Sequence, residues 1–349
     1  MSTRKLDITR KSGKAESLSL KFSQRIIGQP KGTAALTNAL EIFESGFYNR
    51  DKPIYSMLAL GPTGVGKTGS VDAFCEGLFG DAKKKLKVSC GEFQHSHEIA
   101  KLVGSPPGYL GHRETKPYFT NQSLLEARSE KSGALILPFT VVLWDEIEKA
   151  SDALWALMLG ILDKGELTTG TNEPVDFKPT IHIMTSNVGA GELATLAGDA
   201  GLGFQPAGKE ISQQEMEDVA LSAARRKFMP EFLNRINKIV VYNTLQPEDV
   251  KQILSLELQK LQDRVTLRSN QLFTINVSPS AFRQLLKEGY NKKDNARYLQ
   301  RTVEQYVSEP ISSLLATGQI LPRDTVIVDY VDGENWSYYA QGAGDILFP

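Results

Sequence analysis

The chain has 349 residues, of which 41% are hydrophobic and 23% are charged. This composition excludes an intrinsically disordered chain, and the length predicts a large domain with a smaller companion. The 40 Lys and Arg residues balance 41 Asp and Glu residues and leave a net charge of -1, so no overall basic field directs the protein to nucleic acid or to a membrane surface. Two cysteines are too few for a disulfide framework, which favours a reducing, cytoplasmic location.

The N-terminal segment, residues 1–21, is basic, because Lys and Arg outnumber Asp and Glu there. It lacks the apolar run of a secretory signal, and chain termini are commonly mobile. We therefore expect a disordered basic arm that is either solvated or docked on a partner. The longest apolar stretch, Ala134–Trp144, contains Pro138 and is shorter than the roughly 20 residues that cross a bilayer. No membrane span is expected.

Residues 22–244 alternate short apolar runs with helical periodicity, the pattern of an α/β domain with a mostly parallel sheet. The runs are apolar on both faces, which predicts strands that are buried from both sides. The predicted strands are Ile54–Leu60, Leu86–Ser89, Thr140–Trp144, Thr180–Thr185 and Lys238–Tyr242. The helices with the clearest periodicity are Lys31–Phe47, Lys67–Leu78 and Leu154–Lys164.

The pattern changes at Pro247, and residues 245–331 predict a smaller, mainly helical domain. Its predicted elements are a long helix to Arg268, a strand over Leu272–Val277, a helix from Ser278, a helix over Ala296–Thr317 and a strand over Val326–Tyr330. Residues 332–349 are expected to form a C-terminal tail.

The segment Gly61–Thr68 matches the phosphate-loop pattern G-x-x-x-x-G-K-[ST] and lies between a predicted strand and a predicted helix, as that motif requires. Backbone N–H groups of such a loop surround phosphate oxygens, Lys67 reaches the β and γ phosphates, and Thr68 binds Mg²⁺. The sequence therefore predicts a nucleotide and Mg²⁺ site. The residues expected to hold the phosphates are Pro62, Thr63, Gly64, Val65, Gly66, Lys67 and Thr68.

Two further predicted strands bring polar residues to the edge where open α/β sheets bind ligands. One ends in Asp145 and Glu146. We expect Asp145 to hold Mg²⁺ through its water shell and Glu146 to polarise the attacking water. The other strand leads to Asn187, whose amide would orient that water or sense the γ-phosphate, or would serve only as a helix cap.

These motifs, in the order GPTGVGKT, VVLWDEIEKA, MTSN, PEFLNRI and NARYLQR, resemble the AAA+ module of Clp-type protein-remodelling ATPases. They are most similar to the second ATPase domain of ClpB, ClpA and ClpC, and the likeness runs from about Arg25 to Val331. The resemblance implies the AAA+ fold of P-loop NTPases, with a parallel-sheet large domain and a small helical domain. It also implies ATP hydrolysis with Mg²⁺ in a homo-hexameric ring.

The resemblance also implies roles that the local pattern does not reveal. Ile26 and Ile27 match the segment that lies against the adenine, and Arg235 matches the arginine finger that reaches the γ-phosphate held by the neighbouring subunit. Arg297 matches the sensor-two arginine, which contacts phosphate in its own subunit. Without the resemblance, both arginines would be read as surface residues.

The sequence departs from the family pattern at three positions around Arg297. Asn295 stands in place of a usual Gly, and it tolerates left-handed backbone better than most residues do. Tyr298 and Gln300 replace a usual Pro and Lys. The stretch 112–139 is also longer than the corresponding link in the family, so the local pore geometry is expected to differ.

The residues Gly108, Tyr109, Leu110 and Gly111 match the aromatic pore loop of the family. Glycines on both sides of Tyr109 would free an aromatic side chain to press on an extended polypeptide without reading its sequence. The stretch Asp163–Gly170 is similar to the second pore loop. The tripeptide Leu202, Gly203 and Phe204 lies where proteolytic relatives dock on a ClpP-type peptidase, but this signal is weak and the residues favour an ordinary surface loop.

We therefore expect an ATP-hydrolysing unfoldase that threads polypeptide through a hexameric pore, with targeting supplied by the basic arm or by an adaptor protein. Two alternatives stay open. One is a nucleotide-dependent assembly factor for one dedicated partner, and the other is an AAA+ ATPase linked to nucleic acid. The balanced charge and the aromatic pore loop argue against the second alternative.

Overall fold

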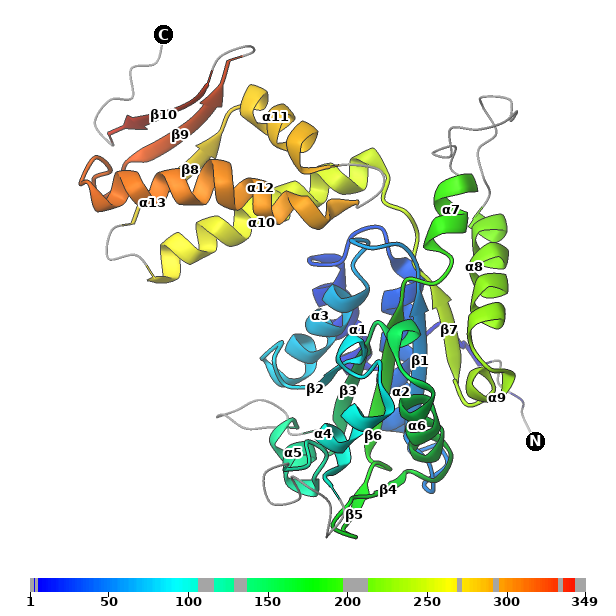
Figure 1. Cartoon of the computed structure of the whole chain (residues 1–349). Helices are drawn as coiled ribbons and strands as arrows, with labels where there is room; N and C mark the ends of the chain where they lie inside the picture. Colours follow the sequence, from blue (N-terminus) through cyan, green and yellow to red (C-terminus); the bar gives the residue numbers. More distant parts are fainter. Residues whose placement is uncertain are drawn as a thin grey trace. The chain divides into compact units, whose positions relative to one another are not determined.

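A computed structural model of the chain describes residues 3, 6–105, 116–128, 137–196, 213–268, 272–290, 295–331 and 335–342. The chain divides into two compact units (Figure 1). The first unit comprises Met1–Pro62 and Gly66–Asn243, and the second comprises Thr63–Val65 and Thr244–Pro349. Among the described residues, no helix is both long enough and apolar enough to cross a membrane.

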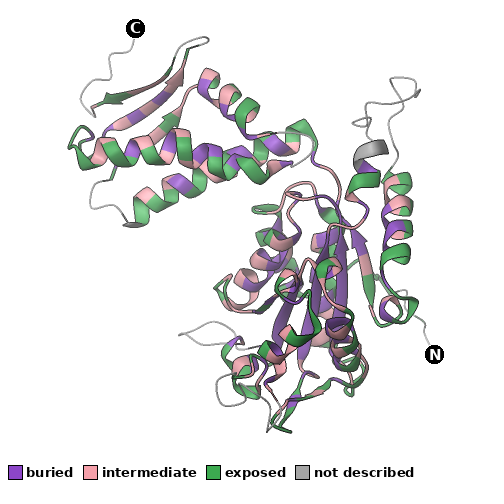
Figure 2. Ribbon diagram, viewed as in Figure 1, coloured by how far each residue is buried: buried purple, intermediate pink, exposed green. Residues whose placement is uncertain are grey.

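The first unit is built on a five-stranded sheet whose neighbouring strands all run parallel. In spatial order the strands are β2 (Leu86–Ser89), β3 (Thr140–Asp145), β6 (Thr180–Ser186), β1 (Tyr55–Leu60) and β7 (Lys238–Val241). The central strands are buried along their length, as Figure 2 shows in purple. The predicted parallel α/β sheet is confirmed, with each strand within about two residues of its expected range.

Helices cover the sheet and supply most of the remaining core. They are α1 (Gly13–Ser23), α2 (Pro30–Ser45), α3 (Lys67–Phe79), α4 (Ala100–Val103), α5 (Asn121–Glu126), α6 (Asp152–Lys164), α7 (Ala190–Leu196), α8 (Gln213–Lys227) and α9 (Pro230–Leu233). The short 3₁₀ turns are η1 (Cys90–Glu92), η2 (Ser96–Ile99) and η3 (Ile147–Lys149). A small hairpin pairs β4 (Glu166–Thr168) with β5 (Pro174–Asp176) directly after α6.

A buried histidine lies in the middle of the sheet. Trp144 of β3 donates its Nε1–H to Nδ1 of His182 on β6 at 2.9 Å, and the Thr180 hydroxyl lies 2.8 Å from Nε2 of the same ring. Complete burial lowers the pKa of His182 to about 3. The ring is therefore neutral in the fold and ties two adjacent strands together.

Helix α1 corrects the expectation that a disordered arm extends to residue 21. Ser12 caps the helix by accepting from the Ala15 N–H group, and the side chains of Ala15, Leu18 and Phe22 are buried. The Phe22 ring is stacked with that of Phe74 on α3, with 6.5 Å between ring centroids. The basic composition hid these apolar residues at three- and four-residue spacing, which form one buried helix face.

The second unit combines helices with a three-stranded sheet. Its helices are α10 (Pro247–Arg268), α11 (Pro279–Gly289), η4 (Ala296–Tyr298), α12 (Leu299–Val303), the π-helical turn η5 (Glu304–Ser308) and α13 (Glu309–Ala316). In the sheet, β9 (Thr325–Tyr330) pairs parallel with β8 (Thr274–Val277) and antiparallel with β10 (Trp336–Gln341).

Two details of the second unit differ from the sequence expectation. The helix predicted over Ala296–Thr317 is interrupted by the π turn just before Pro310, which lacks the N–H group that a continuous α-helix needs. The expected tail contains β10, whose Trp336 ring stacks on Tyr306 at 4.8 Å between centroids. Aromatic packing thus extends the sheet by a strand that shows little alternation of apolar and polar residues.

Candidate nucleotide site

The phosphate loop follows β1 and turns sharply before α3. Gly61, Gly64 and Gly66 have positive φ angles of 147°, 77° and 99°, a backbone region that side chains rarely tolerate. A Cβ atom at Gly61 would lie 2.9 Å from the carbonyl oxygen of Tyr242. Gly66 forms the N-cap of α3, so the first N–H groups of the helix lie beside the loop. This geometry fits an anion such as phosphate.

Lys67 is held at the start of α3 by three oxygen atoms. Its Nζ donates to the carbonyls of Gly61 at 2.7 Å and Pro62 at 2.6 Å, and to Oδ1 of Asn187 at 2.9 Å. Burial lowers the pKa of Lys67 to about 8, although the nearby carboxylates of the site oppose that shift. A phosphate would offer this buried ammonium the full negative charge that the two carbonyls lack.

Asp145, at the carboxyl end of β3, accepts hydrogen bonds from three side chains. Its Oδ1 accepts from the hydroxyls of Thr68 at 3.2 Å and Thr185 at 2.6 Å, and its Oδ2 is paired with Nζ of Lys87 at 2.8 Å. Burial raises the pKa of Asp145, but the hydrogen bonds and the charge of Lys87 outweigh burial and leave the pKa below its ordinary value. Asp145 is therefore ionised at neutral pH.

The oxygen atoms of Thr68 and Asp145 fit a Mg²⁺ ion that also binds nucleotide phosphates. Mg²⁺ prefers hard oxygen ligands and commonly uses one or two protein side chains together with phosphates and water. Among the residues that the structure describes, no group of three or more His, Cys, Asp or Glu side chains gathers to form an all-protein metal site. The donor set therefore suits a metal ion that arrives with the nucleotide.

Glu146 has a left-handed backbone, with φ 59° and ψ 51°, which is uncommon for a residue other than glycine. Its N–H donates to the Thr185 hydroxyl at 3.1 Å. Its Oε2 is paired with Nζ of Lys149 at 2.6 Å, and its Oε1 lies 3.4 Å from Nδ2 of Asn187. Thr185 thus fixes the backbone of Glu146, while Lys149 and Asn187 hold the carboxylate that we expect to contact the attacking water.

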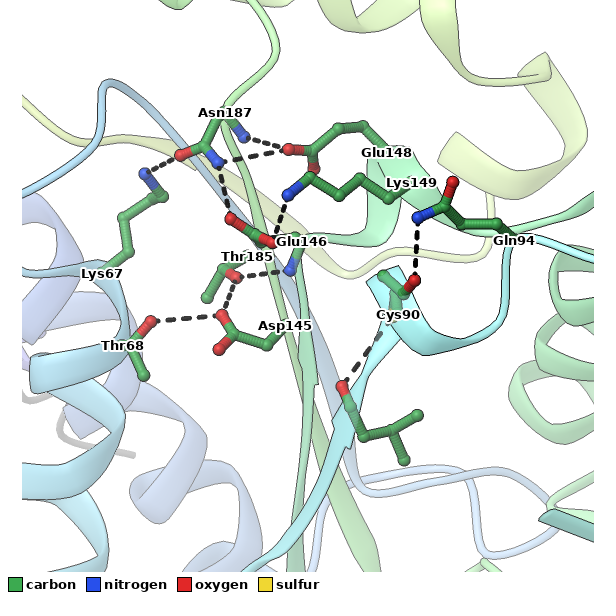
Figure 3. A network of polar contacts seen from close by, with 12 residues as sticks. Lys67, Thr68, Cys90, Gln94, Asp145, Glu146, Glu148, Lys149, Thr185 and Asn187 are labelled. Atoms are coloured by element: carbon green, nitrogen blue, oxygen red, sulfur yellow. Dashed lines mark hydrogen bonds and ion pairs between the residues drawn. The ribbon is translucent and has the colours of Figure 1, made fainter. Parts of the chain in front are cut away.

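Asn187 joins the phosphate-loop lysine to the acidic residues (Figure 3). While its Oδ1 accepts from Lys67, its Nδ2 and its backbone N–H both donate to Oε1 of Glu148 at 3.2 Å. The side chain of Asn187 is therefore engaged in the site, which favours the sensing role over the capping role. Lys87, Glu148, Lys149 and Thr185 were not singled out from the sequence, because partners brought in by separate turns and strands have no local signature.

Arg235 lies at the opposite end of β1 from the phosphate loop. Its carbonyl accepts from the hydroxyl of Ser56, near the start of β1, whereas the loop begins after Leu60. Several residues of extended strand separate the two, a span of about 13 Å at 3.3 Å per residue. The structure brings Lys67, Thr68, Asp145, Glu146 and Asn187 together but does not place Arg235 among them.

The other predicted site residues fall in several places. Ile26 and Ile27 are half-buried in the link between α1 and α2. Arg297 is exposed on η4 of the second unit, after Asn295, whose φ of 51° and ψ of -131° fit the glycine that the family pattern has there. The pore residues Gly108, Tyr109, Leu110 and Gly111, and the tripeptide Leu202, Gly203 and Phe204, lie outside the described residues.

Two protein-family models match the chain. The first, described as the AAA domain of the Cdc48 subfamily, covers residues 52–239, and the second, the C-terminal D2-small domain of ClpB, covers residues 245–328. The chain is 33% identical to chaperone protein ClpB of Dichelobacter nodosus over 318 residues, which are 91% of this chain and 34% of that protein. It is 35% identical over 327 residues to the Clp protease ATP-binding subunit ClpC of Staphylococcus aureus strain USA300, covering 94% of this chain and 38% of that protein.

Solved structures of Hsp104 are also similar. The closed state of Hsp104 with ATPγS and FITC-casein superposes with a TM-score of 0.75 and 28% sequence identity, over 93% of this chain and 52% of that one. The extended conformation of the Saccharomyces cerevisiae Hsp104–casein complex gives the same TM-score at 29% identity, over 91% of this chain and 51% of that one. The chain thus spans a little over a third of these curated relatives and about half of the Hsp104 chains.

Proposed function

Since the chain belongs to the family of AAA domains of the Cdc48 subfamily, we propose that it is a Clp-type ATPase module that couples ATP hydrolysis to the remodelling of polypeptides. The observation that carries this proposal is the network at the carboxyl edge of the sheet. There Thr68 joins the phosphate loop to the carboxylate of Asp145, and Lys67 and Asn187 join it to the carboxylate of Glu146, through contacts of 2.6 to 3.4 Å.

ATP binding begins with an exchange of partners at Lys67. Phosphate oxygens replace the carbonyls of Gly61 and Pro62, so the ammonium gains a negatively charged partner in a buried place. Thr68 and Asp145 would hold Mg²⁺, which would neutralise phosphate charge there. The release of Lys67 frees Oδ1 of Asn187, and the same amide can then orient a water molecule beside Glu146.

Hydrolysis needs a base and a stabilised leaving charge. The water oxygen attacks the γ-phosphorus, the bond to the bridging oxygen breaks, and the proton of the water passes to the Glu146 carboxylate. Lys149 and Asn187 fix that carboxylate from two sides. Arg235 acts on the site of the neighbouring subunit in a homo-hexamer, because β1 keeps it away from Lys67 of its own chain.

The proposed substrate is an unfolded polypeptide, gripped by Tyr109 with Gly108, Leu110 and Gly111. Support comes from the similar Hsp104 structures, which contain casein. Ile26 and Ile27 pack on the adenine, and Arg297 contacts phosphate. An adaptor protein selects the client, and docking of a ClpP-type peptidase through Leu202, Gly203 and Phe204 is the weakest part of the proposal. A cytoplasmic location would keep the buried thiols of Cys75 and Cys90 reduced.

The test is ATP turnover with and without casein, together with ATP affinity and particle mass in ATP. We expect wild type to form a hexamer that casein stimulates. Glu146→Gln should bind ATP without turnover, and Tyr109→Ala should hydrolyse ATP without stimulation. Glu288→Gln, an exposed change on α11, is the matched control and should behave as wild type.

Two results would contradict the proposal. Full turnover by Glu146→Gln would remove the assigned base. A ring that is indifferent both to casein and to Tyr109→Ala would instead identify an assembly factor with one dedicated partner.

A further inference from the structure

A second group of charged side chains lies at the amino end of β1, outside the nucleotide site. Asp163, in the last turn of α6, faces Arg235 through both carboxylate oxygens: Nε of Arg235 lies 3.2 Å from Oδ1 and Nη2 lies 3.3 Å from Oδ2. Nζ of Lys52 approaches Oδ1 at 3.3 Å. These three residues, the Asp163 cluster, form a forked ion pair with a second cation attached.

The backbone of Arg235 is fixed independently of this cluster. The Ser56 hydroxyl donates to the carbonyl of Arg235 at 3.0 Å, and Oδ1 of Asn237 accepts from both the N–H and the hydroxyl of Ser56 at 2.8 Å. The long side chain of Arg235 is therefore held at both ends, by β1 at its base and by α6 at its guanidinium. An arginine that only decorated a surface would need neither restraint.

The pairing leaves the guanidinium able to bind an anion. Arg has five N–H donors, and Asp163 takes the edge formed by Nε and Nη2. Both N–H groups of Nη1 and one of Nη2 remain for a phosphate, which arginine binds in a bidentate manner. Lys52 offsets the charge of Asp163, so the Asp163 cluster keeps a net charge of +1 and stays attractive to phosphate.

The surroundings admit a partner. The side chains of Asp163, Arg235 and Lys52 are 38%, 41% and 42% exposed. Arg235 and Lys52 also line a pocket of about 500 Å³ together with Phe47, Asn234 and Lys238. A pocket lined by three basic side chains suits the nucleotide phosphates that a second copy of the chain would bring to it.

We propose that Asp163 is the positioning residue for the trans-acting arginine, and that Lys52 cancels the charge that this positioning introduces. The inference rests on the proposed trans role of Arg235. Asp163 fixes one rotamer of Arg235 before the subunit meets its neighbour. The entropic cost of ordering this side chain is therefore not added to the free energy of the transition state. Because Asp163 also begins the segment that leads into the β4–β5 hairpin, it joins the arginine to the proposed second pore loop.

The first test compares turnover and ring mass of Asp163→Ala, the nearly isosteric Asp163→Asn and the control Asp51→Asn, which changes an exposed carboxylate outside the Asp163 cluster. Restoring one rotamer-rich side chain to freedom lowers kcat about tenfold in both Asp163 variants. Neither Asp163 variant changes the KM for ATP or the hexamer mass. The Asp51→Asn variant keeps the wild-type kcat, KM and hexamer mass. In the Arg235→Ala background, Asp163→Ala has no further effect. Independent losses in the double variant would overturn the proposal.

The second test uses mixed rings, because a positioning residue for a trans-acting group must act on the neighbour. Subunits with Asp163→Ala are mixed in equal amounts with Glu146→Gln subunits, which lack the base but retain an intact arginine. For random rings of independent sites, a trans effect leaves about a quarter of wild-type turnover, against about a twentieth if Asp163 acts only within its own subunit. The lower value would overturn the proposal.

A parallel mixture separates this inference from the function on which it rests. Arg235→Ala mixed with Glu146→Gln should also recover to about a quarter of wild-type turnover, because intact arginines then reach intact sites. Failure of this mixture would remove the trans role itself, and the positioning role with it. Recovery here without recovery by Asp163→Ala would reject Asp163 alone.

Discussion

Each end of β1 lies beside a group of charged side chains, and the two groups are built differently. At the carboxyl end, Lys67, Asp145 and Asn187 are bonded to several partners within the same chain. At the amino end, Arg235 and Asp163 pair on a surface where each remains about 40% exposed. The comparison teaches that one end holds its polar side chains in fixed positions, whereas the other leaves a paired cation exposed, which is the arrangement that the proposed trans-acting arginine requires.

The strongest test of this difference removes the cation at each end. Lys67→Ala should lose ATP binding, because the buried ammonium is the principal positive charge beside the phosphate loop. Arg235→Ala should keep ATP affinity but lower kcat by a factor on the order of 10³ or more, the usual contribution of an arginine finger. Equilibrium binding of a fluorescent ATP analogue and steady-state turnover check both. Loss of ATP affinity in Arg235→Ala would break the comparison.

Removing one hydroxyl group at each end of β1 should distinguish a residue that acts within its own subunit from one that acts on the neighbouring subunit. Thr185→Val removes one donor to Asp145 and the acceptor for the Glu146 N–H, and Ser56→Ala removes the hydroxyl donor to the Arg235 carbonyl. Each leaves buried polar groups unpaired and should lower the free energy of unfolding by about 2 to 3 kcal/mol. Only Ser56→Ala should recover turnover in rings mixed with Glu146→Gln subunits. Recovery by Thr185→Val would contradict the assignment of the two ends.

The sheet between the two ends should give a smaller, pH-dependent effect. His182 has a pKa of about 3 in the fold and about 6.5 when unfolded, so the unfolded chain binds the extra proton between these values. The contribution of His182 to the free energy of unfolding is complete above about pH 6.5 and decreases as the pH is lowered, by about 2 kcal/mol between pH 7 and pH 5.

Urea unfolding at the two pH values measures that loss. His182→Gln retains an acceptor for the Trp144 N–H but cannot titrate, so it serves as the control. The difference between wild type and this variant isolates the histidine from the carboxylates, which titrate in both. Equal pH dependence in the two proteins would show that His182 does not stay neutral in the fold.

Local patterns predicted the sheet and the central motifs well. The strands are short apolar runs bounded by turns. The phosphate loop and the Asp145–Glu146 pair each consist of consecutive residues at the end of a strand, so their geometry follows from the parallel sheet. Helix α1 was missed because its basic residues obscured three buried apolar positions. Strand β10 was missed because its stability comes from ring stacking with Tyr306, which lies some 30 residues earlier in the chain.

The partners of the motif residues could not be predicted from the sequence. Lys87 reaches Asp145 from the neighbouring strand, and Asp163 reaches Arg235 from the end of α6. Such pairs depend on register and on helix length, which a single sequence does not determine to one residue. The sequence therefore indicated candidate residues for the chemistry, and the structure added the residues that hold them in place.

The placement of Ser56 and Gly61 at opposite ends of one strand has a consequence for assembly. If each arginine serves only the next subunit, an open row of subunits always contains one nucleotide site without an arginine and one arginine without a site. Closure into a ring removes both defects at once. Turnover per subunit should then climb with protein concentration through the open intermediates and level off when the circle is complete.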